Sequence, residues 1–160
     1  MGNPTVFVVD ADLDSLDRLH DILTDAGFNP ILWWEATRAH DLVREVQPLL
    51  VLLERDLERP GEGLDVLAEL RADPATSRIP VTLIARDVGT PAGVMESRNG
   101  PLPRMLVKPL EASELVEVVE DALASRMVFP GARSRPTASP APDDIAGVGR
   151  RLTLRRTGNG

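Results

Sequence analysis

Leu50-Val51-Leu52-Leu53-Glu54 is a short apolar run that ends on a carboxylate, and the fold prediction starts from it. Nearly continuous apolar runs of this length are typical of parallel strands that helices cover on both faces. Four further runs of strand length lie at residues 6–9, 31–34, 81–84 and 105–107. The pattern therefore predicts five parallel strands.

Amphipathic stretches separate these runs and predict the connecting helices. We expect the first helix over residues 15–26, with Asp14 as its cap and Gly27 as its stop, and we expect Ser113 to cap the last. The others are expected at residues 39–46, 63–71 and 91–97, with the last stripe at 115–123.

This alternation of strands and helices indicates an α/β protein with a doubly wound open sheet, because parallel crossovers are almost always right-handed. Such sheets place function at the carboxyl ends of their strands. The residues at those ends are Asp10, Glu54, Ala85 and Lys108.

The composition is that of an ordinary globular protein with one domain. The chain has 160 residues, of which 42% are hydrophobic and 27% charged. The longest apolar run, residues 49–53, is too short for a membrane span or a signal-peptide core. The absence of cysteine excludes disulfides and thiolate metal sites. We expect a cytoplasmic protein that does not contact membranes.

The end of the chain differs from the rest in composition and charge. We expect residues 127–160, rich in Pro, Ser and Arg, to form a disordered tail. Residues 128–160 carry a net charge of +4, which leaves −11 for the remainder of a chain with −7 overall. An acidic globule repels nucleic acid, so we expect such a partner only through the tail's basic patch of Arg150, Arg151, Arg155 and Arg156.

Several short motifs occur together at strand ends and turns over residues 4–126. They are Val8-Val9-Asp10-Ala11-Asp12, Leu52-Leu53-Glu54, Arg71-Ala72-Asp73-Pro74-Ala75-Thr76, Ile79-Pro80-Val81 and Val107-Lys108-Pro109. With these motifs the chain resembles the receiver domain of bacterial response regulators. The resemblance implies a flavodoxin-like (CheY-like) five-stranded sheet of order 2-1-3-4-5. It also implies a role in two-component (phosphorelay) signal transduction.

Receiver domains of that family hold Mg²⁺ with an acidic pair after the first strand and accept phosphate on an aspartate after the third. A Thr or Ser after the fourth strand and a lysine after the fifth complete the site. This chain matches the set at Asp10 and Lys108, but it has Ala11 at the second acidic position, Glu54 at the phosphoacceptor position and Ala85 at the hydroxyl position. The resemblance therefore implies a degenerate site, as in a pseudo-receiver.

The three replacements remove chemistry that phosphorylation needs. Mg²⁺ requires near-octahedral oxygen ligands, and phosphoryl transfer depends on positioning and on cations that neutralise the oxygens. Alanine at position 11 supplies no ligand, and Ala85 donates no hydrogen bond. We expect a protein that is not an enzyme and needs no cofactor, with at most weak Mg²⁺ binding by Asp10 and Asp12.

The role of Glu54 has three interpretations from sequence. Glu54 is a permanent charge in place of a phosphoryl group, or Glu54 and Asp10 are simply counter-ions of Lys108. A third interpretation is a phosphorylatable receiver that uses Glu54, or Asp56 because the following loop is one residue longer than usual, with help from Asp12. A nucleotide-binding enzyme on the same fold is disfavoured, since no glycine-rich phosphate loop follows any strand.

We expect a stand-alone receiver that acts by contact with another signalling protein, either a histidine kinase or an output protein, with a homodimer as an alternative. Trp33 and Trp34 should point to opposite sides of the sheet, so one should pack and the other, Trp34, is a candidate contact residue. Met105 stands where the family usually has a coupling aromatic, and it is the second candidate.

Overall fold

The computed structural model of this chain describes residues 2–87 and 103–128. Five parallel strands form one sheet in the order β2-β1-β3-β4-β5. The predicted fold class is confirmed. The strands are β1 (Thr5–Val9), β2 (Asn29–Trp33), β3 (Leu50–Glu54), β4 (Val81–Ala85) and β5 (Arg104–Val107).

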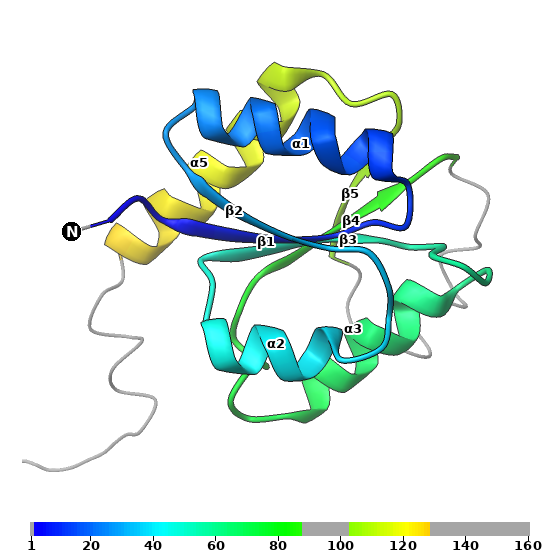
Figure 1. The fold of residues 1–160 in the computed structure, drawn as a ribbon. Helices are drawn as coiled ribbons and strands as arrows, with labels where there is room; N and C mark the ends of the chain where they lie inside the picture. The colour runs from blue at the N-terminus through cyan, green and yellow to red at the C-terminus, as the bar shows by residue number, and fades with distance from the viewer. Residues whose placement is uncertain (1, 88–102, 129–160) are drawn as a thin grey trace, which may run out of the picture. The chain divides into compact units, whose positions relative to one another are not determined.

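Within the described residues, helices cover both faces of this sheet. As Figure 1 shows, α1 (Leu13–Asp25) and α5 (Ala112–Val128) lie on one face, and α2 (Ala39–Val46) and α3 (Glu62–Ala72) lie on the other. Among the described residues, no helix could serve as a membrane span. The helix expected near residues 91–97 and the basic patch of the tail lie outside the described residues.

Two hydrophobic cores result, one on each face of the sheet. Val6 and Val8 of β1 pack under α1 and α5, whereas Phe7 and Val9 pack under α2 and α3. Successive side chains of a strand point to opposite faces, so a central strand that is covered twice must be apolar throughout. All five residues of β3 are buried for this reason, including Glu54 at its end.

Both predicted helix caps are wrong by two residues. The N-cap of α1 is Asp12, whose carboxylate accepts hydrogen bonds from the backbone N–H groups of Asp14 (3.0 Å) and Ser15 (3.4 Å). Asp12 and Asp14 have the same capping chemistry, and only the extended backbone of Asp12 distinguishes them. Similarly, α5 begins at Ala112, so Ser113 lies inside its first turn.

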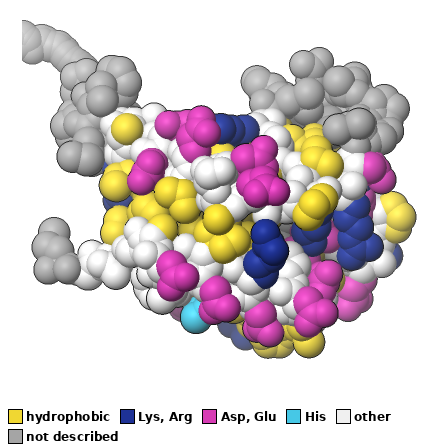
Figure 2. Space-filling model, turned by 90° about the horizontal axis from the view of Figure 1, so that it is seen from above, with side chains coloured by type: hydrophobic (Ala, Val, Ile, Leu, Met, Phe, Trp, Pro, Cys, Tyr) yellow, Lys and Arg dark blue, Asp and Glu magenta, His cyan; other side chains and the backbone are white. Residues whose placement is uncertain are grey.

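Among the charged side chains on the face covered by α1 and α5, acidic ones predominate (Figure 2). Seen from above in Figure 2, Asp and Glu side chains are spread over this face among apolar patches and fewer basic side chains. Four aspartates of α1 are exposed there, namely Asp14, Asp17, Asp21 and Asp25. This agrees with the excess of negative charge in the sequence before the tail.

Candidate functional site

Three charged side chains from three strand ends meet at the carboxyl edge of the sheet. The Nζ atom of Lys108, which follows β5, lies 2.9 Å from Asp10 Oδ2 and 3.0 Å from Glu54 Oε1. Asp10 and Glu54 are 0% and 1% exposed, and the side chain of Lys108 is 16% exposed. The N–H of Lys108 donates to the carbonyl oxygen of Ala85 at 2.8 Å, which continues the pairing of β5 with β4. One ammonium group is therefore placed between two buried carboxylates.

The carboxylate of Asp10 is fully engaged by neighbouring groups. Its Oδ1 accepts a hydrogen bond from the N–H of Asp12 at 2.9 Å. Its Oδ2 accepts from the hydroxyl of Ser15 at 2.6 Å and from Lys108 Nζ at 2.9 Å. Ser15 is not among the site residues that the sequence predicts. The Asp12 cap is the signal that could find it, since this cap places Ser15 in the first turn of α1.

Glu54 is much less well satisfied than Asp10. Neither of its carboxylate oxygens accepts a well-aligned hydrogen bond from a described residue, and its closest contact is Lys108 Nζ at 3.0 Å from Oε1. Arg86 Nη2 lies 3.9 Å from Glu54 Oε2, and the Arg86 side chain is 67% exposed. Burial raises the pKa of Glu54, and the charge of Asp10 raises it further, against the opposing effect of Lys108 and Arg86. Burial alone would lower the pKa of Lys108, but its two acidic partners outweigh burial and raise it.

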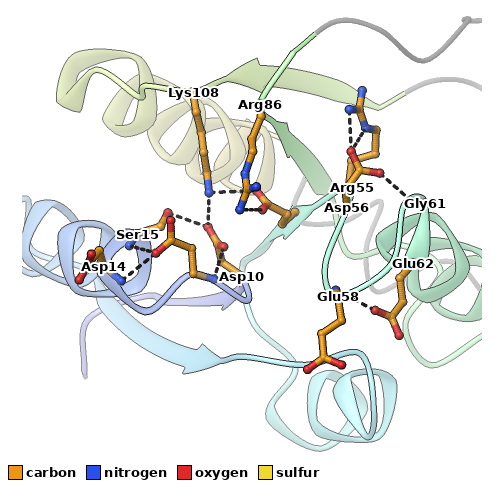
Figure 3. Close-up of polar contacts among 12 residues, drawn as sticks. Asp10, Asp14, Ser15, Arg55, Asp56, Glu58, Gly61, Glu62, Arg86 and Lys108 are labelled. Atoms are coloured by element: carbon orange, nitrogen blue, oxygen red, sulfur yellow. Dashed lines mark hydrogen bonds and ion pairs between the residues drawn. The ribbon is translucent and has the colours of Figure 1, made fainter.

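Asp56 belongs to a different cluster, which is separate from Lys108 in Figure 3. Its Oδ1 accepts a hydrogen bond from the N–H of Gly61 at 2.6 Å, and its Oδ2 accepts one from Arg55 Nε at 2.7 Å. Arg55 is 4% exposed, and it is not among the site residues that the sequence predicts. Both carboxylate oxygens of Asp56 therefore take part in hydrogen bonds within the loop between β3 and α3.

Comparison with known proteins agrees with the fold. The DNA-binding response regulator MtrA of Mycolicibacterium paratuberculosis is 34% identical over 119 residues, which is 74% of this chain and 50% of the relative. MtrA of Mycobacterium leprae matches to the same extent. This chain thus spans about half the length of the curated relatives it matches. It carries a receiver domain.

Solved structures support the receiver fold. The receiver domain of a sensor histidine kinase from Pseudomonas aeruginosa PAO1, solved with magnesium in its active-site cleft, has a TM-score of 0.66 at 15% identity. That match covers 77% of this chain and 99% of the other. A CheY-like receiver domain protein from Methanospirillum hungatei JF-1 has a TM-score of 0.67 at 17% identity, covering 79% and 98%. No family model matches the sequence.

In this receiver, the remaining two positions of the expected site carry no polar side chain. Ala85 ends β4 and is 1% exposed, and Ala11 is half-buried directly after Asp10. Among residues 2–87 and 103–128, no group of three or more His, Cys, Asp or Glu side chains is arranged to hold a metal ion. A pocket of about 460 Å³ opens beside the site, and its lining includes Arg86 and Lys108.

Glycine at position 63 fixes the backbone of the receiver directly after Glu54. The N–H of Gly63 donates to the carbonyl oxygen of Arg55 at 2.8 Å. A Cβ atom at this position would overlap the carbonyl oxygen of Glu54. Because α3 approaches the chain this closely, the end of β3 has little freedom to move.

The two tryptophans of the receiver differ in burial as predicted, but their rings lie against each other and do not point to opposite sides of the sheet. Trp33 packs against the core under α2 and α3, and its indole N–H donates to the carbonyl oxygen of Thr37 at 2.8 Å. Trp34 is 49% exposed, and its ring centroid lies 4.5 Å from that of Trp33. Met105 is partly buried against the same core, which leaves less of it for a partner. A partner contact through Trp34 or Met105 stays a prediction.

Glu54→Gln should raise the melting temperature by a few degrees at pH 7. The pKa of Glu54 is raised above 4.5 in the folded protein, so the folded state binds its proton more tightly than the unfolded chain does. The stability contributed by Glu54 is then complete below pH 4.5 and is lost as the pH rises through the raised pKa. The melting temperatures of the two proteins should converge as the pH falls toward 4.5.

Thermal unfolding between about pH 4 and pH 8 measures this difference. The matched control is Glu45→Gln on the exposed side of α2, which should leave the melting temperature unchanged. A lower melting temperature for Glu54→Gln at pH 7 would contradict the expectation.

Proposed function

We propose that this receiver domain acts in two-component signalling by protein contact, with Glu54 as a fixed negative charge where other receivers acquire a phosphoryl group. One observation carries the proposal. Lys108 is already paired with Asp10 at 2.9 Å, yet a second buried carboxylate lies 3.0 Å from the same ammonium group. Glu54 is not needed to neutralise Lys108, and its burial works against its ionisation. A signalling role for the charge of Glu54 therefore explains this buried carboxylate better than a role as a counter-ion of Lys108.

The surroundings of Asp10 do not suit Mg²⁺, which supports a site that works without phosphorylation. Both oxygens of Asp10 are occupied by hydrogen bonds from Asp12, Ser15 and Lys108. Ala11 offers no ligand, and the carboxylate of Asp12 caps α1. Mg²⁺ takes its ligands from carboxylates, phosphate and water in strict octahedral geometry, so binding would first require breaking these contacts.

A glutamate reproduces a phosphoryl group only in part. It carries one negative charge, whereas a phosphoryl group carries about 1.5 to 2 and offers three acceptor oxygens. Within the site, this single charge is placed against Lys108 and Arg86. We therefore propose a permanent, intermediate signalling state. The partner in this proposal is a histidine kinase or an output protein, with self-association as the alternative, and exposed Trp34 is the candidate contact.

Incubation with acetyl phosphate and Mg²⁺, followed by intact-mass measurement, tests the proposal. We expect no mass gain, because the site lacks ligands for the metal and a hydroxyl for the transferred group. Addition of one phosphoryl group that disappears in Glu54→Ala would contradict the proposal. Addition that disappears in Asp56→Ala would instead move the phosphoacceptor to the cluster formed with Arg55.

A further inference from the structure

Two pairs of charged residues lie at the ends of the neighbouring strands β3 and β4, and the order of their charges is reversed between the two strands. β3 and β4 are paired in parallel, and Glu54 lies opposite Ile84 in their register. Glu54 and Arg55 are negative then positive, whereas Arg86 and Asp87 are positive then negative. Arg86 Nη2 lies 3.9 Å from Glu54 Oε2, and Arg55 Nη2 lies 3.1 Å from Asp87 Oδ1. Each residue therefore meets its opposite charge across the two strand ends.

Arg55 is the fixed part of this arrangement. Its guanidinium group is buried and donates to the carbonyl oxygen of Asp87 at 3.1 Å, in addition to the Asp87 carboxylate and the carboxylate of Asp56. Its own N–H donates to the carbonyl oxygen of Ile84 at 2.7 Å. The rigid fork of a guanidinium directs several hydrogen bonds at once, which an ammonium cannot match. Arg55 thus ties the loop after β3 to residue 87.

Arg86 is the adjustable part. Its side chain is 67% exposed and approaches Glu54 only at ion-pair distance, so this contact depends on charge and not on packing. The preceding residue is Ala85, which has no hydroxyl that could contact a group at position 54. Arg86 is the first side chain after β4 that reaches the site.

We propose that Arg55 and Arg86 form a two-point clamp through which the charge of Glu54 sets the position of residues 86–87. Arg55 anchors residue 87, and Arg86 responds to Glu54. The inference rests on the proposed function, since it takes Glu54 as the signalling charge.

Backbone amide NMR on the full chain tests the clamp. Glu54→Gln should shift the amide signals of Arg86 and Asp87 and speed their hydrogen exchange by about 1.5- to 5-fold, the range that corresponds to an exposed ion pair. Arg86→Met should shift the same signals. When Glu54→Gln is added to Arg86→Met, the amide signal of residue 87 should not change further. When it is added to Arg86→Lys, which keeps the charge, that signal should still shift.

The matched control is Arg78→Met, an exposed arginine before the other end of β4, which should leave these signals unchanged. Unchanged sheet amides in every variant show that the fold is intact. The clamp proposal is contradicted if Glu54→Gln leaves the amide signals of residues 86 and 87 unchanged. It is also contradicted if Glu54→Gln shifts them as much in the Arg86→Met variant as in the unmodified chain. Phosphorylation of the chain would overturn the proposed function instead, so the two failures are distinguishable.

Discussion

Replacing Lys108 by Met should lower the free energy of unfolding at pH 7 by about 3 to 5 kcal/mol, the cost of leaving a buried charge without its partner. Asp10 and Glu54 are 0% and 1% exposed, and Lys108 lies within 3.0 Å of both. Without the ammonium group, two carboxylates would remain side by side in the interior. Methionine keeps much of the length and apolar stem of lysine, so the loss reports mainly on charge.

Urea denaturation measures this loss, and a second variant isolates its cause. In Glu54→Gln/Lys108→Met only one buried acid stays charged, so part of the lost stability should return. The deficit of Lys108→Met should also shrink at low pH, where the carboxylates are protonated. A loss below about 1 kcal/mol, typical of an exposed ion pair, would mean that the three groups are not coupled as described.

Ordinary phosphorylation should return when the three replaced positions are restored together. We expect Ala11→Asp/Glu54→Asp/Ala85→Thr to accept a phosphoryl group from acetyl phosphate and Mg²⁺ at least ~100-fold faster than the unmodified chain, since misplacement of a reacting group by near 1 Å alone costs about that factor. Position 11 gains a metal ligand, position 54 regains the shorter carboxylate, and position 85 gains a donor. Glu54→Asp alone should gain little, because the metal ligand is still missing.

The matched control is Ala11→Asp/Glu54→Ala/Ala85→Thr, which has no acceptor at position 54 and should show no mass gain. If the restored protein also stays unmodified, the three positions do not explain the inactivity. The hydrogen bonds of Ser15 and Lys108 to Asp10 would then be the next candidates for the block.

The sequence predicted the sheet well because its central strands are buried on both faces. Continuous apolar runs such as residues 50–53 admit few other structures, and the carboxyl ends of parallel strands must meet at one edge. That rule is sufficient to place Asp10, Glu54 and Lys108 at one edge of the sheet. Helix starts were less predictable, because Asp12 and Asp14 offer the same chemistry and only backbone conformation decides between them.

The residues that the sequence analysis missed share one property. Ser15, Arg55 and Arg86 all lie just after a strand or in a first helical turn, where no periodic pattern specifies side-chain direction. Arg55 and Arg86 each follow directly a residue that the pattern did identify. The partners of Arg55 and Arg86 cannot be identified from sequence, because each contact joins two strand ends about thirty positions apart in the chain.

Lys108 is the only lysine in the 160 residues, which gives a direct test of whether its site is already filled. Protein labelled with ¹⁵N-lysine has a single side-chain ammonium group, and it can be titrated with beryllofluoride and Mg²⁺ as a phosphoryl mimic. We predict that the Lys108 ammonium signal does not move, because Asp10 and Glu54 already hold it. A saturable shift of that signal that requires both Mg²⁺ and beryllofluoride would contradict the account.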